Sequence, residues 1–560
     1  MGESRLNNSV RNIKYAIINT LIISVIPFIT RTIFIRILGK TYLGVDALFL
    51  NVINLIEIVN IGIGSAITYS VYKPIKENNI EKCRSLFRLY RNCYYVMGTI
   101  VFGVGLILTP FITFLIKDKP DIPENLHVIY LIILLGVVSG YFFADKQCII
   151  NAHQKNYVIS KVKMIVILII NIIEIALLFL TKQYLIYLIV QTCQNLMINL
   201  VVAYKAKKLY PYFFGGEKPK PIEKHEKQAI VKNTTALIFN RAGSLIINTT
   251  DNIIISAFVG IGAVGIYSNY FMVKNMVNTF TTVFTQSLTS SIGNLNAEEE
   301  KSDKVRLNEV FSHVFFINYF LHAFCAVCLF CLLDPFIAIW IGESYCMGVW
   351  VALIVAVNYY LLGVQKTAEQ FKSACGLFWQ DRFRVLIEAG INLVLSIIFV
   401  LILPADWKVF GVLLGTLLSN LCVTFWLEPL IVHKYALNKK VPRFYLKNLF
   451  YLLIAGAIGA GIFFLNRLLF GVSGNILEFA LRVLITVVCA FGLLCLVFIK
   501  NKYFRKTMDI ARNLISQMWK RVFKRRSCKK IKKESQTIDS SEGSTGGEHK
   551  KNMEERGEEQ

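Results

Sequence analysis

Long apolar runs follow one another along almost the whole chain, separated by short polar segments. A stretch of about 20 apolar residues is long enough to cross a bilayer as an α-helix. By this criterion the pattern predicts about fourteen transmembrane helices. The expected fold class is therefore all-α and integral to the membrane.

One apolar run, residues 233–252, carries polar side chains along a single face. With successive residues about 100° apart on a helix, these side chains share an arc of roughly 120°. They are Asn233, Asn240, Arg241, Ser244, Asn248, Asp251 and Asn252. A charge in the middle of a bilayer costs several kcal/mol. The stripe is therefore expected to face other protein or a water-filled cavity.

Similar stripes follow the helices predicted at 42–72 and 264–292. The first holds Asp46, Asn54, Glu57, Asn60, Gly64 and Thr68, and the second holds Tyr267, Tyr270, Lys274, Asn278, Thr281 and Thr285. The helix predicted at 13–37 has a looser polar face, with Thr30 on it and Arg31 beside it. Four such helices, two from each half of the chain, would enclose one central polar cavity.

The chain resembles itself at an offset of 221 residues. The matches include Asn19 with Asn240, Gly39 with Gly260, Gly44 with Gly265, and Asn54 with Asn275. These are polar or glycine positions, which chance similarity between apolar helices would not favour. Spans one to six therefore correspond to spans seven to twelve. Because six is an even number, both copies should share one orientation in the membrane.

The domain boundaries follow from this repeat. We expect an N-lobe of six spans at residues 1–207, a cytoplasmic linker at 208–228 and a C-lobe of six spans at 229–434. The linker is charged and proline-containing, which is typical of a boundary. Two additional helices at 435–499 have no counterpart in the repeat. Residues 500–560 form a basic and then disordered cytoplasmic tail, since the last part is mostly Ser, Gly, Glu and Lys.

Composition agrees with a membrane protein: 55% of the residues are hydrophobic and 17% are charged. The mean hydropathy is +0.53. The net charge of +25 does not require nucleic acid as a partner, because the basic residues gather in alternate loops, as the positive-inside rule describes. The same rule places both termini in the cytoplasm.

The charged residues within the stripes are of both signs. The cations are Arg31, Arg241 and Lys274, and the anions are Asp46, Glu57 and Asp251. Arg and Lys side chains bind phosphate, and amide and hydroxyl groups match the donors and acceptors of a sugar. The polar side chains predicted to bind such a ligand, a sugar with an anionic group, are Asn240, Ser244, Asn248, Tyr267, Tyr270 and Asn278. An alternative stays open, in which the cations only neutralise acids inside a packed bundle.

The three acids are the candidates for coupling transport to Na⁺ or H⁺, and no other cofactor or metal is expected. Glu174 and Glu428 rank lower because their spans show no clear stripe. We expect no enzymatic activity and no catalytic residue, since no loop is long enough to hold a catalytic domain.

Five stretches carry a resemblance to a known family. They are R-N-I-K-Y-A-I-I-N-T from Arg11, L-G-K-T-Y-L-G-V-D-A-L-F from Leu38, G-I-G-S-A-I from Gly62, A-H-Q-K-N-Y-V-I-S from Ala152 and G-L-F-W-Q-D-R-F-R from Gly376. The chain resembles the Wzx-type polysaccharide flippases, which transport lipid-linked oligosaccharides and belong to the multidrug/oligosaccharidyl-lipid/polysaccharide exporter superfamily.

The resemblance implies a monomeric protein of the bacterial plasma membrane that moves undecaprenyl-pyrophosphate-linked oligosaccharide outward by alternating access. It implies membrane lipids as surroundings, and a polysaccharide polymerase and glycosyltransferases as partners in the pathway of a capsule or exopolysaccharide. The related lipid II flippases suggest that the two additional helices form a lipid groove. The alternative function is a cation-coupled multidrug antiporter of the same superfamily, although cavity cations would repel a cationic drug.

Overall fold

The computed structural model describes residues 5–60, 63–214, 242–247, 249–298, 304–377, 379–470, 475–509 and 512. All regular structure within these ranges is helical, as expected. The chain divides into two units, Met1–Leu494 and Cys495–Gln560. Most of the predicted linker and the predicted disordered tail lie outside the described residues.

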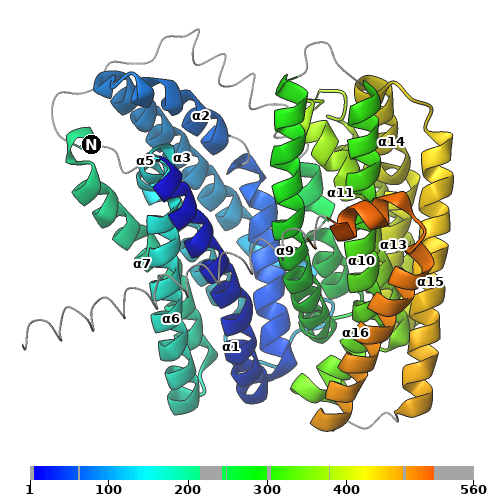
Figure 1. Ribbon diagram of the computed structural model, residues 1–560. Helices are drawn as coiled ribbons and strands as arrows, with labels where there is room; N and C mark the ends of the chain where they lie inside the picture. Colours follow the sequence, from blue (N-terminus) through cyan, green and yellow to red (C-terminus); the bar gives the residue numbers. More distant parts are fainter. Residues whose placement is uncertain are drawn as a thin grey trace, which may run out of the picture. The chain divides into compact units, whose positions relative to one another are not determined.

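The helices of the N-lobe come first in the chain (Figure 1). They are α1 (Arg5–Ile56), η1 (Glu57–Asn60), α2 (Ile63–Lys76), α3 (Ile80–Leu108), η2 (Thr109–Leu115), α4 (Leu126–Ser139), η3 (Gly140–Phe143), α5 (Ala144–Ala152), α6 (Asn156–Thr181) and α7 (Tyr184–Leu209). The short helix η4 (Pro211–Phe213) follows α7.

The C-lobe begins with helical residues at 242–247 and 249–258. It continues with α9 (Ile261–Glu298), α10 (Lys304–Ile341), η5 (Glu343–Tyr345), α11 (Val349–Ala374), α12 (Arg384–Ile402), η6 (Ala405–Trp407), α13 (Lys408–Cys422), α14 (Thr424–Val432) and the π-helix η7 (His433–Leu437). The two additional helices are α15 (Pro442–Leu469) and α16 (Ile476–Phe498).

Eleven helical segments of the described residues are long and apolar enough to cross a membrane, so this is a multi-pass membrane protein. They do not establish the expected count of fourteen. The segment Ile22–Ile56 contains parts of the first two predicted spans, which the non-helical backbone of Gly39 separates. The span predicted at 230–258 is only partly described. Helix α9 has 38 residues but is not among the eleven, since its polar stripe lowers its hydropathy.

The single helix predicted at 42–72 is wrong. Helix α1 ends at Ile56, the 3₁₀ turn Glu57–Asn60 follows, and α2 begins at Ile63. A 3₁₀ turn advances about 120° per residue instead of about 100°, so the stripe predicted from Asp46 to Thr68 does not stay on one face. At this break, Tyr141 Oη donates a hydrogen bond of 2.9 Å to Glu57 Oε1.

Two glycines at equivalent positions of the repeat bend the chain. Gly39 has φ 83° and interrupts α1, and Gly260 has φ 133° immediately before α9. Residues with a side chain rarely adopt a positive φ, whereas glycine adopts it readily. The offset of 221 residues therefore marks the same turn in both copies.

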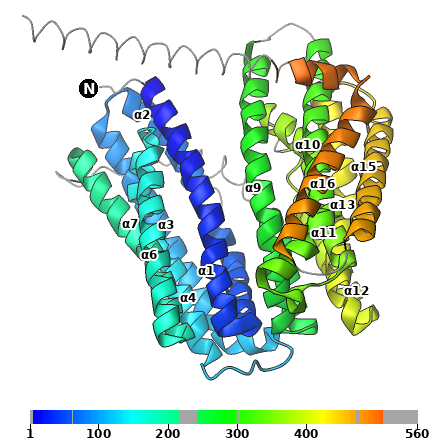
Figure 2. The ribbon, with the colours of Figure 1, turned by 60° about the horizontal axis from the view of Figure 1, so that its bottom comes forward.

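Helices α1 and α9 touch backbone to backbone at two further glycines. A Cβ atom on Gly44 would lie 2.0 Å from the carbonyl oxygen of Ile261, and one on Gly265 would lie 2.1 Å from that of Lys40. The two contacts are related by the same 221-residue offset, because Lys40 corresponds to Ile261 and Gly44 to Gly265. Helix α1, in blue, and helix α9, in green, are neighbours in both views (Figures 1 and 2).

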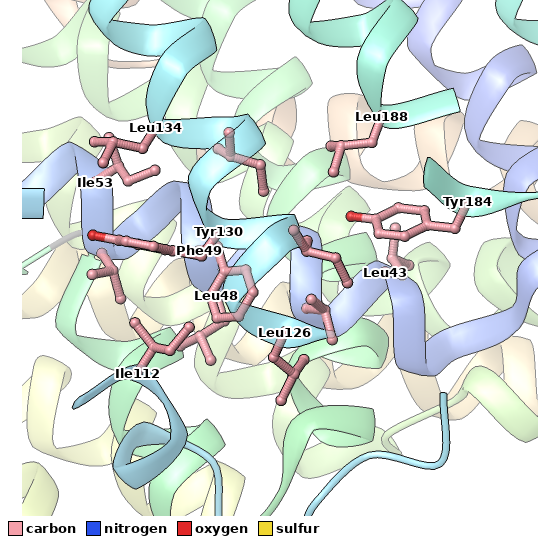
Figure 3. Close-up of a cluster of buried hydrophobic side chains, with 14 of the residues drawn as sticks. Leu43, Leu48, Phe49, Ile53, Ile112, Leu126, Tyr130, Leu134, Tyr184 and Leu188 are labelled. Carbon is pink, nitrogen blue, oxygen red and sulfur yellow. The ribbon is translucent and has the colours of Figure 1, made fainter. Parts of the chain in front are cut away.

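Each lobe packs its own apolar core. In the N-lobe, Leu48 and Phe49 of α1 meet Tyr130 and Leu134 of α4 (Figure 3). The rings of Phe49 and Tyr130 have centroids 5.5 Å apart in an edge-to-face arrangement, which aromatic quadrupoles favour. A separate cluster joins α9, α11 and α13 in the C-lobe. The paired glycines of α1 and α9 thus connect two bodies that are each internally packed.

Candidate functional site

A cavity of about 650 Å³ lies within the C-lobe. Its wall comes from residues before Gly260 and from α9, α11, α12, α13 and α14, of which Figure 2 labels all but α14. Four of the predicted binding residues, Ser244, Tyr267, Lys274 and Asn278, line it together with Asp251, a predicted ion-coupling residue. Further amide and hydroxyl groups come from Asn358, Gln365, Thr416, Asn420 and Thr424. Such a concentration of hydrogen-bonding groups suits a polar ligand.

Asp251 is held by neutral partners at the wall of this cavity. Its side chain is buried, and Thr416 Oγ1 lies 3.1 and 3.2 Å from its two carboxylate oxygens. Asn392 Nδ2 donates to Thr416 Oγ1 at 2.9 Å, and Thr250 Oγ1 donates to Asn392 Oδ1 at 3.3 Å. The hydrogen bonds to Asp251 therefore come from neutral groups, and the cation that offsets its charge is Lys274, through space.

Lys274 projects from α9 into the same cavity. Its ammonium nitrogen lies 4.4 Å from the centroid of the Phe271 ring, which is a cation–π distance. Within the described part of the chain it forms no ion pair or hydrogen bond. Lys274 and Asp251 interact electrostatically across the cavity, so the alternative in which Lys274 offsets the charge of Asp251 stays open. With no hydrogen bond or close ion pair, the ammonium can still contact an anionic ligand in the cavity.

A buried ion network forms one end of the cavity wall. Lys372 Nζ lies 2.5 Å from Asp381 Oδ2 and 2.7 Å from Glu428 Oε1. Arg384 binds the same two acids, with Nε 2.5 Å from Asp381 Oδ1 and Nη2 3.3 Å from Glu428 Oε1. Glu388 Oε2 lies 3.6 Å from Arg384 Nη1. The network ties α11, α12 and α14 together.

The charges of this network do not balance. Three carboxylates, on Asp381, Glu388 and Glu428, face two cations, on Lys372 and Arg384, and all five side chains are buried. Glu388 also accepts hydrogen bonds from Asn420 Nδ2 at 3.1 Å and from Thr424 Oγ1. These bonds compensate part of its desolvation. Counted formally, the five residues of the network therefore carry one more negative charge than positive.

Arg31 lies elsewhere, in the contact between the lobes. Its Nε donates to Asn269 Oδ1 at 2.7 Å, and its Nη2 donates to Ser268 Oγ. Asp46 follows the Gly39 break in α1, and its Oδ1 is buried without a hydrogen-bond partner among the described residues. Neither residue lines the C-lobe cavity. The structure thus separates Arg31 from Lys274, which the sequence placed in one vestibule.

The remaining predicted residues have varied surroundings. Tyr270 Oη donates to Asp334 and accepts a bond of 2.7 Å from the backbone nitrogen of Met347, away from the cavity. Glu57 is bonded to Tyr141 at the break after α1. Asn240, Arg241 and Asn248 lie outside the described residues.

The ion network was not predicted. Glu428 ranked low because α14 shows no polar stripe, and Arg384 served only as part of a family-like stretch. One signal was present: Asp381, Arg384 and Glu388 are spaced by three and four residues, which places opposite charges together at the start of a helix. Lys372 lies on another helix, so its part depends on tertiary packing.

Comparisons with known proteins agree with this architecture. A family model described as "polysaccharide biosynthesis protein" matches residues 9–289, just over half of the 560 residues. No curated protein sequence matches the chain.

Several solved structures are similar in fold. One is the lipid II flippase MurJ in an inward closed conformation, with a TM-score of 0.61 and 14% identity, covering 87% of this chain and 99% of that chain. Another is a multidrug resistance MATE family transporter of the MOP superfamily in an inward-facing conformation, with a TM-score of 0.57 and 12% identity, covering 74% and 96%. A mutant of the MATE transporter VcmN of Vibrio cholerae has a TM-score of 0.53 and 11% identity, covering 78% and 99%.

At such low identities the likeness shows the fold alone. The fold is shared with solved membrane transporters and with a flippase. The chain belongs to the polysaccharide biosynthesis protein family and has the fold of the MOP-superfamily transporters.

Proposed function

We propose that the protein flips an undecaprenyl-pyrophosphate-linked oligosaccharide from the inner to the outer leaflet of the bacterial plasma membrane by alternating access. The observation that carries this proposal is the ammonium of Lys274, which faces an amide-lined cavity of about 650 Å³, forms no hydrogen bond or close ion pair among the described residues, and interacts with Asp251 only through space. Family membership and the fold shared with a lipid II flippase support the same substrate class.

In this mechanism the pyrophosphate or an acidic sugar pairs with Lys274, because a charge-assisted hydrogen bond is about twice as strong as a neutral one. Sugar hydroxyls bond to the amides of Gln365 and Asn420, which otherwise bond to each other at 2.7 Å. The prenyl chain stays in the lipid, where its burial costs nothing. Rocking of the two lobes then opens the cavity to the other side.

Coupling of this step to an ion would use Asp251. Its carboxylate and the oxygens of Thr416 and Asn392 form an oxygen-rich pocket suited to Na⁺, and the carboxylate alone is suited to H⁺. Both termini would face the cytoplasm, and the protein would act as a monomer beside the polymerase and glycosyltransferases of a capsule or exopolysaccharide pathway.

The test replaces Lys274 by Gln in purified protein reconstituted in liposomes that contain a fluorescent undecaprenyl-pyrophosphate oligosaccharide. Losing a charge-assisted contact worth about 1.5–3 kcal/mol should slow transport by about tenfold or more. Lys408→Gln, at the start of α13 and not on the cavity wall, is the matched control and should transport normally.

Equal transport by both variants would refute the role of Lys274. A wild-type protein that leaves the lipid-linked sugar in place but exchanges a cationic drug for Na⁺ or H⁺ would instead be a multidrug antiporter.

A further inference from the structure

A groove on the C-lobe shares only Arg384 with the cavity described above. It measures about 520 Å³ and lies between the turn that precedes α12 and the end of α14. Three aromatic side chains along it are unusually open: Trp379 is 63% exposed, Phe383 52% and Tyr435 52%. Around the end of α14 the groove meets a second hollow of about 690 Å³, with which it shares Leu430 and Lys434.

The two hollows carry charge of one sign. Arg382 and Lys434 line the first, and Lys439 and Lys440 join Lys434 in the second. Among the described residues that line them, none is Asp or Glu. The neighbouring acids are engaged behind the groove, where Asp381 and Glu428 bind Lys372 and Arg384. The groove therefore attracts anions.

Arg382 is held ready for such a ligand. Its guanidinium carbon lies 4.0 Å from the centroid of the Trp379 ring and 4.6 Å from that of Phe383, and Nη1 donates to the carbonyl oxygen of Trp379 at 2.7 Å. Stacking fixes the plane of the guanidinium, which lowers the entropy lost when its other N–H groups bind phosphate. No carboxylate among the described residues occupies them.

The opposite wall of the groove has an uncommon backbone. Lys434 and Tyr435 belong to the π-helix His433–Leu437, which continues α14. π-helical turns are rare, and those that occur are frequently at functional sites. Here the wider turn presents Lys434 and Tyr435, both exposed, to the groove.

The groove lies where apolar spans end. The span Arg384–Ile402 begins beside it, the span Ala405–Leu437 ends beside it, and Pro442–Leu469 begins at the second hollow. Trp and Tyr are enriched at this level of a bilayer. Below the cations, the exposed apolar side chains of Ile387, Leu427 and Leu430 line the groove between α12 and α14. An anionic head above and an apolar chain below is the pattern of a membrane lipid.

We propose that this groove binds an anionic glycerophospholipid of the inner leaflet, with its phosphate on Arg382 and Lys434 and an acyl chain along Ile387 and Leu427. The basic ends of spans face the cytoplasm, where anionic lipids attract Lys and Arg. This groove is not the transport cavity, so the proposal does not depend on which substrate the protein carries.

The test uses the full-length protein in neutral detergent and counts bound lipid by native mass spectrometry. Phosphatidylglycerol and phosphatidylcholine with identical chains are compared, with inorganic phosphate as a third arm. The wild type should bind phosphatidylglycerol more tightly than phosphatidylcholine. Each lost cation should weaken binding of phosphatidylglycerol about fivefold, so Lys434→Gln, whose side chain is exposed, should show a smaller loss than the double variant Arg382→Gln/Lys434→Gln.

Lys408→Gln, at the other end of the span, is the control and should bind phosphatidylglycerol like the wild type. The proposal is overturned if the wild type binds both lipids equally or if the double variant keeps its preference. It is also overturned if inorganic phosphate competes as well as the lipid does, because the site would then recognise a free anion.

Discussion

The two lobes place different chemistry at equivalent positions. In the N-lobe, Thr30 Oγ1 donates to Asn171 Oδ1 at 2.7 Å. The residues 221 positions later are Asp251 and Asn392, which share the hydroxyl of Thr416 as a hydrogen-bonding partner. The same pair of helices thus meets in each lobe through an asparagine, but only the C-lobe adds a charge.

The ion network shows the same difference more strongly. Its five members are Lys372, Asp381, Arg384, Glu388 and Glu428, and the residues 221 positions before the first four are Asn151, Ser160, Lys163 and Ile167. The N-lobe equivalents include no acid, so the network has no counterpart there. The duplicated backbone is common to both lobes, whereas the charged cavity belongs to one. The two lobes therefore share a backbone fold but differ in the charged side chains that they bury.

Removing Arg384 should have the largest effect. Arg384→Leu leaves Asp381 and Glu428 buried with only Lys372 to compensate them, and breaking a buried pair in this way costs about 3–5 kcal/mol of unfolding free energy. Lys163→Leu at the equivalent N-lobe position is the control and should cost less than about 1 kcal/mol. Denaturant unfolding of the purified proteins in detergent measures both, and similar losses would contradict the asymmetry between the lobes.

The glycine contacts should respond alike in both lobes. Gly44→Ala and Gly265→Ala each force a methyl group to within about 2 Å of a backbone carbonyl oxygen, and overpacking of this kind costs about 1–3 kcal/mol. Gly390→Ala, where a Cβ meets nothing within 4 Å, should be neutral or stabilising in its helix. Thermal unfolding midpoints report the three variants. A large loss in only one of the first two would show that the contacts are not equivalent.

A smaller effect is expected when the C-lobe pair is made to resemble that of the N-lobe. Asp251→Thr keeps a hydroxyl beside Thr416 and Asn392 but removes the charge, so the protein should fold while transport falls about tenfold, equivalent to about 1.4 kcal/mol. Transport into liposomes should also lose its response to Na⁺ or H⁺. Thr30→Val removes the N-lobe hydroxyl and should leave that response unchanged. An Asp251→Thr protein with normal ion dependence would exclude Asp251 from coupling.

Much of the fold follows from the sequence, because apolar length and periodicity are local properties. The helical fold class could be predicted from the apolar runs, and the equivalence of Gly39 with Gly260 and of Gly44 with Gly265 could be predicted from the sequence repeat. The break at Glu57–Asn60 was not, since its residues continue an apolar run and Glu57 finds its partner, Tyr141, 84 residues away.

The candidate site was only partly predictable for a related reason. A stripe on one helix identifies the side chains that avoid lipid, as it did for Asp251 and Lys274, but it does not identify the surface they meet. Arg31 does not line the cavity because its guanidinium donates hydrogen bonds to Ser268 and Asn269 in the contact between α1 and α9. Lys372 and Glu428 line the cavity because α11, α12 and α14 converge at the ion network, which the periodicity of a single helix does not reveal.

The reciprocal seating of Gly44 on Ile261 and of Gly265 on Lys40 has the form of an isologous interface, in which one patch meets its own copy across a twofold axis. A surface of this kind is self-complementary before any linker joins its halves. At these two glycines the single chain therefore keeps the backbone contact of a homodimer, although the residues that Gly265 and Gly44 meet, Lys40 and Ile261, now differ.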